Sequence, residues 1–216
     1  HLKIARKLQA AGDPSASQWF DSSLKSFVQA SQKNPTPELY GYRAFCHLQL
    51  RQDVNAILYY GKATQAGLPS AAAFNNLGIA LIRRQRHAEA IAAFTSAIEF
   101  NPDMQAAYLS RALAAFGKSF PSKSCVPSQA TADIDRAIEI GPPSRSLLVS
   151  AIRIWSRTVP IDEVGLLRTC QLAAACGVPS GEIDMLVAQN ALPTADENLD
   201  EVRRQIRRAV AVSYTH

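Results

Sequence analysis

Residues 71–104, AAAFNNLGIALIRRQRHAEAIAAFTSAIEFNPDM, carry the pattern that decides the fold. Apolar and small residues recur in both halves at the spacing of one helix face. They are Phe74, Leu77, Gly78 and Leu81, followed by Ala90, Phe94, Ala97 and Ile98. The polar run 83–87 separates the two sets, so the pattern predicts two amphipathic helices joined by a short turn. Gly78 is expected to let the helices approach closely.

The same pattern continues on both sides of this segment. One series recurs at equal intervals and consists of Tyr40, Phe74 and Tyr108. A second series consists of Ala56, Ala90 and Ala130. Its first two members are separated by the same interval as in the first series, and its last two by a longer interval. Prolines lie at the ends of the units, and residues typical of helix starts stand beside them: Thr36, Ser70, Asp103 and Ser144. The chain is therefore expected to repeat one helical hairpin.

The length of this unit and the order of its small and large residues resemble the tetratricopeptide repeat family. The resemblance implies an all-α fold, a right-handed superhelix (α-solenoid) of antiparallel helical hairpins. Residues 71–104 match the family pattern at nearly every position. Residues 37–70 form a looser copy, with Arg43 where a leucine is usual, and residues 105–144 form a copy with a six-residue insertion.

The pattern predicts a single helical-repeat domain over residues 1–216. Residues 1–36 are expected to form degenerate N-terminal helices, and residues 145–179 a degenerate repeat, because 166–179 follows the spacing of 56–69. Residues 180–216 are expected to form C-terminal capping helices, with a capping box at Thr194 and Glu197. The inserted segment 119–128 contains two prolines and is predicted to be a surface loop.

Composition excludes several classes of protein. The chain has 216 residues, of which 47% are hydrophobic and 19% charged, so it can bury a core and is not disordered. Its net charge of +5 is spread along the chain, and no aromatic residues stand between the arginines at 203–208, which argues against nucleic-acid binding. No apolar run is long enough to span a membrane, so a soluble protein is expected. Four cysteines without a C-x-x-C pair favour a cytoplasmic location.

No group of residues predicts catalysis. The four histidines are scattered, and none pairs with a cysteine at the spacing of metal ligands. Asp133 and Asp135 are two positions apart on a predicted helix, so they face different directions. There is no phosphate-binding loop and no G-x-S-x-G motif. We therefore expect no catalytic residue, no metal, no cofactor and no enzyme.

In the family that the chain resembles, the first helix of each hairpin lines a concave face that binds a peptide or a partner helix. Carrying over those positions predicts ten binding residues: Tyr42, Phe45, Asn75, Asn76, Ile79, Ile82, Arg83, Leu109, Leu113 and Phe116. Some family members bind a C-terminal carboxylate with lysine, arginine and asparagine. Here Gly41 and Phe45 replace the first pair of those residues, so an apolar peptide or amphipathic helix is the expected ligand. The alternative is that these side chains only pack between neighbouring hairpins.

The expected function is a non-catalytic scaffold for protein–protein interaction. An alternative stays open, namely a regulatory or substrate-positioning domain of a larger enzyme such as a protein kinase or a transferase. The chain begins with His1 rather than methionine, which motivates this alternative. The identity of the protein partner and self-association also stay open at this stage.

Overall fold

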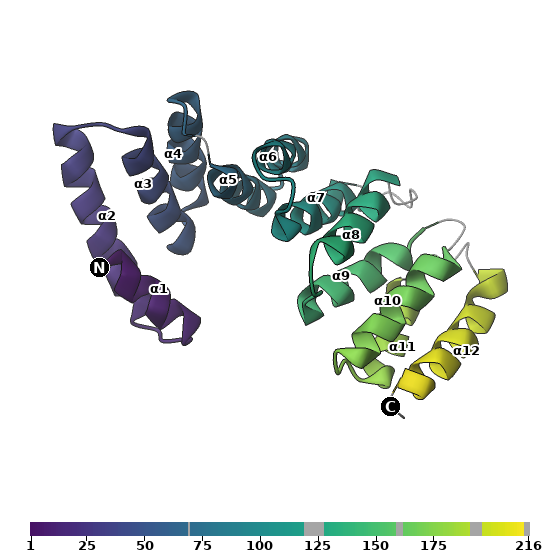
Figure 1. Ribbon diagram of the computed structural model, residues 1–216. Helices are drawn as coiled ribbons and strands as arrows, with labels where there is room; N and C mark the ends of the chain where they lie inside the picture. The colour runs from purple at the N-terminus through teal and green to yellow at the C-terminus, as the bar shows by residue number, and fades with distance from the viewer. Residues whose placement is uncertain (69, 119–127, 159–161, 191–195, 214–216) are drawn as a thin grey trace. The chain divides into compact units, whose positions relative to one another are not determined.

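The computed structural model describes residues 1–68, 70–118, 128–158, 162–190 and 196–213. Within these ranges it has twelve α-helices and no strand (Figure 1). The helices are α1 Leu2–Ala10, α2 Ala16–Lys33, α3 Pro37–Gln49, α4 Asp53–Gln65, α5 Ala71–Arg83, α6 His87–Phe100, α7 Gln105–Lys118, α8 Ser128–Ile140, α9 Arg145–Trp155, α10 Glu163–Ala175, α11 Ser180–Asn190 and α12 Asp196–Ser213. The all-α prediction is confirmed.

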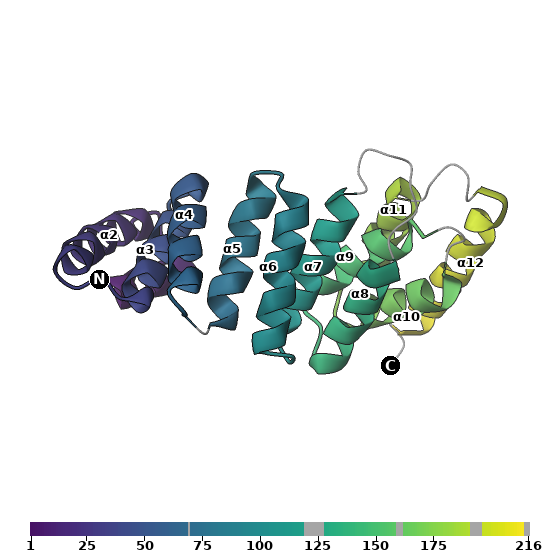
Figure 2. The ribbon, with the colours of Figure 1, turned by 90° about the horizontal axis from the view of Figure 1, so that it is seen from above.

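The chain divides into two compact units, His1–Ser110 and Arg111–His216, and helix α7 contributes to both. In the first unit each helix packs against the next one along the chain, from α1 to α6. Figure 2 shows α3, α4, α5 and α6 side by side. Helix α3 also contacts α5, so the first helices of two successive hairpins are neighbours. The single-domain organisation and the repeat boundaries given above stay predictions.

Three helix turns of the first unit share one geometry. In each turn, a residue with positive φ lies seven positions after a buried small residue. The pairs are Ala5 and Gly12, Ala44 and Arg51, and Gly78 and Gln85, with φ angles of 70°, 59° and 59°. The next amide donates to a carbonyl of the preceding helix at 2.9–3.0 Å in all three turns. Helices α1 and α2 therefore form a hairpin of the same kind as α3–α4 and α5–α6.

The predicted close approach at Gly78 is confirmed. A Cβ atom added to Gly78 would lie 2.5 Å from Cε1 of Phe94, which is only 1% exposed. The ring of Phe94 thus occupies the space that any larger residue at position 78 would need. Tyr60 holds the position of Phe94 in the preceding hairpin, and it is buried beside Ala44 in a core cluster with Ala56, Ala73 and Ala80.

Three of the four predicted helix starts act as N-caps. The hydroxyls of Thr36, Ser70 and Ser144 accept hydrogen bonds from the amides three residues on, at 3.2–3.4 Å. The prediction for Asp103 is wrong by one residue, because α7 begins at Gln105 and its N-cap position is therefore residue 104. The capping box at Thr194 and the loop 119–127 lie outside the described residues.

Arg43, which replaces a leucine of the family pattern, is held between three helices. Its guanidinium donates to Ser31 Oγ of α2 at 2.8 Å and to the hydroxyl of Tyr59 of α4 at 2.5 Å. It also lies 4.0 Å from the centre of the Tyr59 ring. The buried ring of His47 stacks on Tyr59 and shares a hydrogen bond of 2.6 Å with Gln52. Polar contacts therefore replace the aliphatic packing expected at this position.

The second unit contains a turn that matches the first unit. Gly177 at the end of α10 and Gly67 at the end of α4 have φ angles of 80° and 85°. The following amide donates to Ala173 in one case and to Ala63 in the other, at 2.9 Å and 3.0 Å. This is the correspondence between 166–179 and 56–69 that the sequence suggests. Helix α9 packs against both α10 and α11.

Polar pairs also connect helices of the second unit. Arg111 of α7 makes two hydrogen bonds of 2.7 and 2.8 Å to the Asp133 carboxylate of α8, which is 2% exposed. Arg203 of α12 binds Asp184 of α11 in the same two-pronged way. Arg203 thus connects α12 to α11. Beside Arg203 on α12, Val202, Ile206 and Val210 are buried.

The contact between Gly78 and Phe94 gives a direct test of the packing. We expect Gly78→Ala to lower the free energy of unfolding by about 1–3 kcal/mol, because the new methyl group overlaps the ring of Phe94. The control is Gly61→Ala in α4, where an added Cβ meets no atom within 4 Å. This control should be neutral or slightly stabilising, because alanine favours a helix over glycine. Equal denaturant midpoints for the two variants would contradict this packing.

His47 predicts a pH dependence of stability. Burial lowers the pKa of His47, the hydrogen bond shared with Gln52 opposes this, and the nearby charge of Arg43 lowers the pKa further. Below about pH 6.5 the unfolded chain therefore binds this proton more readily than the folded chain does. The free energy of unfolding should fall as the pH drops from about 7.5 to 5.5, and His47→Gln should reduce that fall. An unchanged pH dependence in urea titrations of this variant would refute this role.

Candidate functional site

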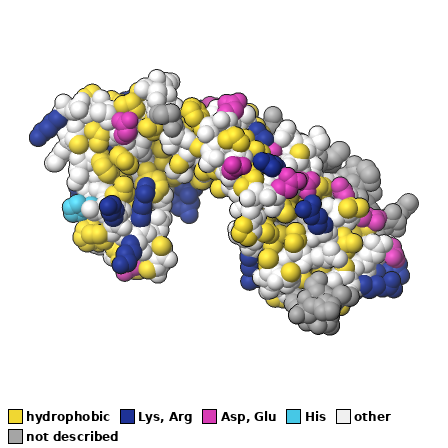
Figure 3. All heavy atoms as spheres, viewed as in Figure 1, with side chains coloured by type: hydrophobic (Ala, Val, Ile, Leu, Met, Phe, Trp, Pro, Cys, Tyr) yellow, Lys and Arg dark blue, Asp and Glu magenta, His cyan; other side chains and the backbone are white. Residues whose placement is uncertain are grey.

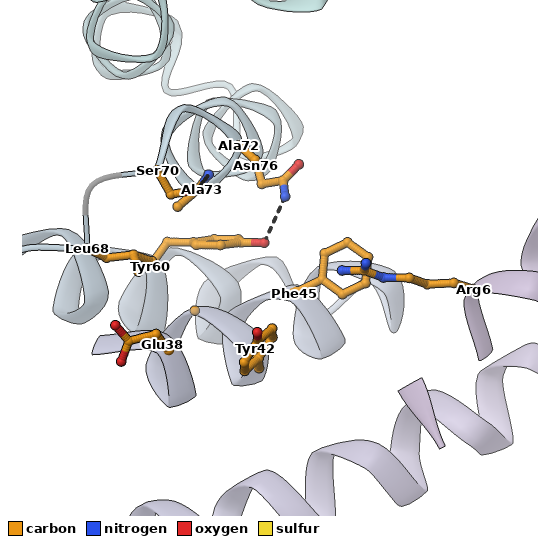
Figure 4. A pocket seen from close by; sticks show the side chains of 11 residues that line it. Arg6, Glu38, Tyr42, Phe45, Tyr60, Leu68, Ser70, Ala72, Ala73 and Asn76 are labelled. Carbon is orange, nitrogen blue, oxygen red and sulfur yellow. Dashed lines mark hydrogen bonds between the residues drawn. The ribbon is translucent and has the colours of Figure 1, made fainter. Parts of the chain in front are cut away.

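A pocket of about 190 Å³ opens in the first unit, between α3 and α5 (Figure 4). Helix α1 contributes one residue at its rim, and the end of α4 contributes part of its floor. The lining residues are Arg6, Glu38, Gly41, Tyr42, Phe45, Tyr60, Leu68, Ser70, Ala72, Ala73 and Asn76. Seven of them lie on α3 and α5, the first helices of two successive hairpins, namely Glu38, Gly41, Tyr42, Phe45, Ala72, Ala73 and Asn76.

Two aromatic side chains form the apolar wall of the pocket. Tyr42 is 44% exposed, and its ring stacks on Phe27 of α2 with 5.2 Å between ring centres. Phe45 packs edge-on against Phe20 at 6.0 Å. The guanidinium of Arg6 lies 4.5 Å from the centre of the Phe45 ring, as a cation over an aromatic face. Both rings are thus held in place by neighbouring helices.

Tyr60 and Asn76 form the polar part of the pocket. The amide nitrogen of Asn76 donates to the hydroxyl oxygen of Tyr60 at 3.1 Å, which Figure 4 marks with a dashed line. Burial raises the pKa of Tyr60, so this hydroxyl stays protonated. Among the described residues no acceptor takes the Tyr60 proton, and no donor binds the carbonyl oxygen of Asn76. The pair therefore offers one donor and one acceptor to a ligand.

The charges of the lining side chains cancel. Arg6 contributes a positive charge and Glu38 a negative one, and they come from different helices, α1 and α3. The other lining residues are neutral. A strongly charged ligand therefore gains little from this pocket, whereas an uncharged segment meets aromatic surface and two hydrogen-bonding groups.

The structure brings three of the ten predicted binding residues together at the pocket: Tyr42, Phe45 and Asn76. Asn75 is buried, and Ile79 packs against the core cluster around Ala44 and Tyr60. Arg83 donates to the Leu48 carbonyl at 3.1 Å and to the Asp53 carboxylate at 3.2 Å. For Asn75, Ile79 and Arg83 the structure thus shows packing or pairing within the chain. Contact of these three with a partner stays a prediction.

The remaining predicted residues lie outside the pocket. Ile82 and Leu109 are half-buried within the first unit. Leu113 and Phe116 belong to the second unit, where Leu113 is 39% exposed. The guanidinium of Arg157 lies 5.6 Å from the centre of the Phe116 ring. Their role in binding also stays a prediction.

The sequence did not single out Arg6, Tyr60, Leu68, Ser70 or Ala73 as pocket residues. Arg6 was missed because the first hairpin is out of register with the repeat. Ala5 corresponds to Ala44 in the structure, but the two residues are not separated by one repeat length. With that register Arg6 takes the position of Phe45, directly after the buried small residue. Tyr60 packs in the core cluster at the position of Phe94, so its place in the repeat gives no signal that its hydroxyl lies at the pocket edge.

The described residues offer little for covalent or metal chemistry. Burial raises the pKa of the Cys46 thiol to about 11 and that of Cys170 to about 12, so both thiols stay protonated and unreactive. Within the described part of the chain, no three His, Cys, Asp or Glu residues are grouped so as to hold a metal ion. In the same residues, no helix has the length and hydrophobicity needed to cross a membrane.

The sequence and the fold were compared with those of known proteins. The family model of the tetratricopeptide repeat matches residues 71–104. A search of curated protein sequences finds no match. Several solved structures have a similar fold at low sequence identity.

Three of these structures are similar to this protein over nearly the whole chain. A structure from a functional characterisation of Pseudomonas aeruginosa pilF has a TM-score of 0.66 and 14% identity, over 99% of this chain and 93% of that one. A thermophilic TPR protein from Thermus thermophilus has a TM-score of 0.54 and 18% identity, over 97% of each chain. A tetratricopeptide repeat protein from Parabacteroides merdae ATCC 43184 has a TM-score of 0.52 and 16% identity, over 99% and 89%.

The sequence match and the shared fold agree with the hairpin geometry described above, in which Gly78 and Phe94 pack together within the matched segment. Residues 71–104 match the tetratricopeptide repeat, and the chain has the fold of tetratricopeptide-repeat proteins.

Proposed function

We propose that this chain is a non-catalytic scaffold whose first unit binds an uncharged peptide segment of a partner protein in the pocket between α3 and α5. The tetratricopeptide repeat and the shared fold support a protein-interaction scaffold. The position and chemistry of the pocket support the choice of this surface. The observation that carries the proposal is the pair of free hydrogen-bonding groups on Tyr60 and Asn76.

A peptide group matches the polar edge of the pocket. The peptide carbonyl accepts a hydrogen bond from the Tyr60 hydroxyl, and the peptide N–H donates a hydrogen bond to the side-chain carbonyl oxygen of Asn76. Tyr60 is 2% exposed and fixed in the core cluster, so its oxygen is already in position before a ligand arrives. Such preorganisation lowers the entropic cost of binding.

An apolar side chain of the peptide matches the aromatic wall. Tyr42 and Phe45 present ring surface held by Phe27 and Phe20, and aromatic residues of this kind are enriched at protein interfaces. Arg6 covers one face of Phe45 and thereby limits the width of the apolar surface. The cancelling charges of Arg6 and Glu38 favour a peptide without strong net charge.

Ala72 allows a test that leaves the fold intact. It is exposed, lines the pocket and is the second residue of α5, so Ala72→Arg places a long side chain across the opening. The probes are peptides selected from a phage-displayed random library on the wild-type chain and then labelled for fluorescence anisotropy. We expect Ala72→Arg to weaken their binding by about tenfold or more, which corresponds to about 1.4 kcal/mol.

The matched control is Ala88→Arg. Ala88 is also exposed and is the second residue of α6, but it does not line the pocket. The control should bind the selected peptides like the wild type. A library that enriches no peptide, or equal affinities for both variants, would reject the proposed site. Ile79→Arg is less suitable, because Ile79 packs against the core.

A further inference from the structure

A second surface of the first unit carries aliphatic side chains that the fold does not bury. Val54 and Leu58 of α4 are 63% and 50% exposed and lie one helical turn apart. Ile57 between them is half-buried and packs on the core cluster. Figure 3 shows hydrophobic and basic side chains close together over the first unit. Exposed aliphatic pairs at this spacing form a narrow apolar ridge that suits a partner helix.

The ridge borders two hollows lined by arginines. A hollow of about 380 Å³ lies between Val54, Ile57 and Leu58 on one side and Arg84 and Arg86 on the other. A smaller one of about 190 Å³ adjoins it, where Arg51 and Arg84 flank Val54. We call this surface, made of Arg51, Val54, Ile57, Leu58, Arg84 and Arg86, the α4 edge. It shares no residue with the pocket between α3 and α5.

Of the three arginines of the α4 edge, Arg86 is paired with a carboxylate, whereas Arg51 and Arg84 are not paired in the described part of the chain. Asp53 pairs with Arg83 at 3.2 Å, and Glu89 pairs with Arg86 at 2.7 Å, so both nearby carboxylates are already engaged. Arg51 and Arg84 form no ion pair with any described residue. Positive side chains are favourable at the ends of α3 and α5, next to the last carbonyl groups. That effect explains the arginines, but it does not explain the exposed Val54 and Leu58.

We infer that the α4 edge binds a short acidic amphipathic helix of a partner protein. Aliphatic side chains of that helix cover Val54 and Leu58, and its carboxylates pair with Arg84 and Arg51. A second copy of this chain in a twofold arrangement would place arginines against arginines, so charge argues against self-association here. Nucleic acid is disfavoured as well, because no aromatic side chain lines the surface for base stacking.

The inference is tested with a synthetic helical peptide of about 14 residues that has leucines on one face and glutamates on the other. The peptide is titrated into the isotope-labelled full chain, and amide chemical shifts are followed by NMR. We expect shifts at 51–58 and 84–86, and a loss of binding at high salt. A matched peptide with lysine in place of glutamate should bind about tenfold or more weakly.

Four variants separate this surface from general charge effects. Arg84→Glu should weaken binding by about tenfold or more, whereas Arg208→Glu, the same charge change on an exposed arginine of α12, should have little effect. Leu58→Gln should also weaken binding, because it removes an exposed apolar contact without opening the core. Ala72→Arg, which changes the pocket between α3 and α5, should leave binding of the acidic peptide unchanged. The result for the pocket and the result for the α4 edge can therefore be told apart.

Several results would overturn the inference. Equal effects of Arg84→Glu and Arg208→Glu would mean that the acidic peptide responds only to net charge. Shifts at Tyr42 and Asn76 instead of 51–58 would place the ligand in the pocket. A DNA oligonucleotide that produces the same shifts and is insensitive to Leu58→Gln would identify the α4 edge as a nucleic-acid surface. Absence of any shift at 51–58 and 84–86 would remove the α4 edge as a docking site.

Discussion

The contact between a small residue on the first helix of a hairpin and a large residue on the second is the constraint on which the structure depends. At Gly78 the missing side chain admits the ring of Phe94 so closely that a Cβ atom would not fit. This contact fixes the rotation of both helices about their axes. Once that rotation is fixed, the residues on the opposite face of the first helix are committed to a neighbouring helix or to solvent. The pocket follows from this arrangement, because Asn76 and Ala72 lie on the part of α5 that remains accessible.

Local patterns predicted most of the fold of the first unit. The helical spacing of Phe74, Leu77 and Leu81 and the polar run that follows define one hairpin without reference to distant residues. Capping residues such as Ser70 and Ser144 act on amides only three positions away, so they too are readable from sequence. The hairpin of α1 and α2 was harder to identify, because the long helix α2, Ala16–Lys33, shifts the register away from the period of the repeat.

The candidate site was predictable only in part, for physical reasons. The position of a residue in one helix determines the direction in which its side chain points. It does not determine whether a neighbouring helix covers that side chain. Tyr42 and Asn76 stay accessible, whereas Ile79 is taken up by the core cluster of α3, α4 and α5. Arg6 reaches the pocket from a helix whose register the repeat did not reveal. Tertiary neighbours therefore decide the site, and a periodic pattern does not specify them.

Helix α4 joins the two surfaces of the first unit. Tyr60 faces the pocket from this helix, while Val54 and Leu58 of the same helix face the α4 edge. The lining charges of the pocket cancel, whereas Arg51 and Arg84 of the α4 edge form no ion pair with a described residue, so the ligands proposed for the two surfaces differ in chemistry. Ile57 and Tyr60 of α4 pack in one core cluster, so the same helix and the same core support both surfaces. Thermodynamic linkage then requires that a coupling between the two ligands, of either sign, be equal in both directions.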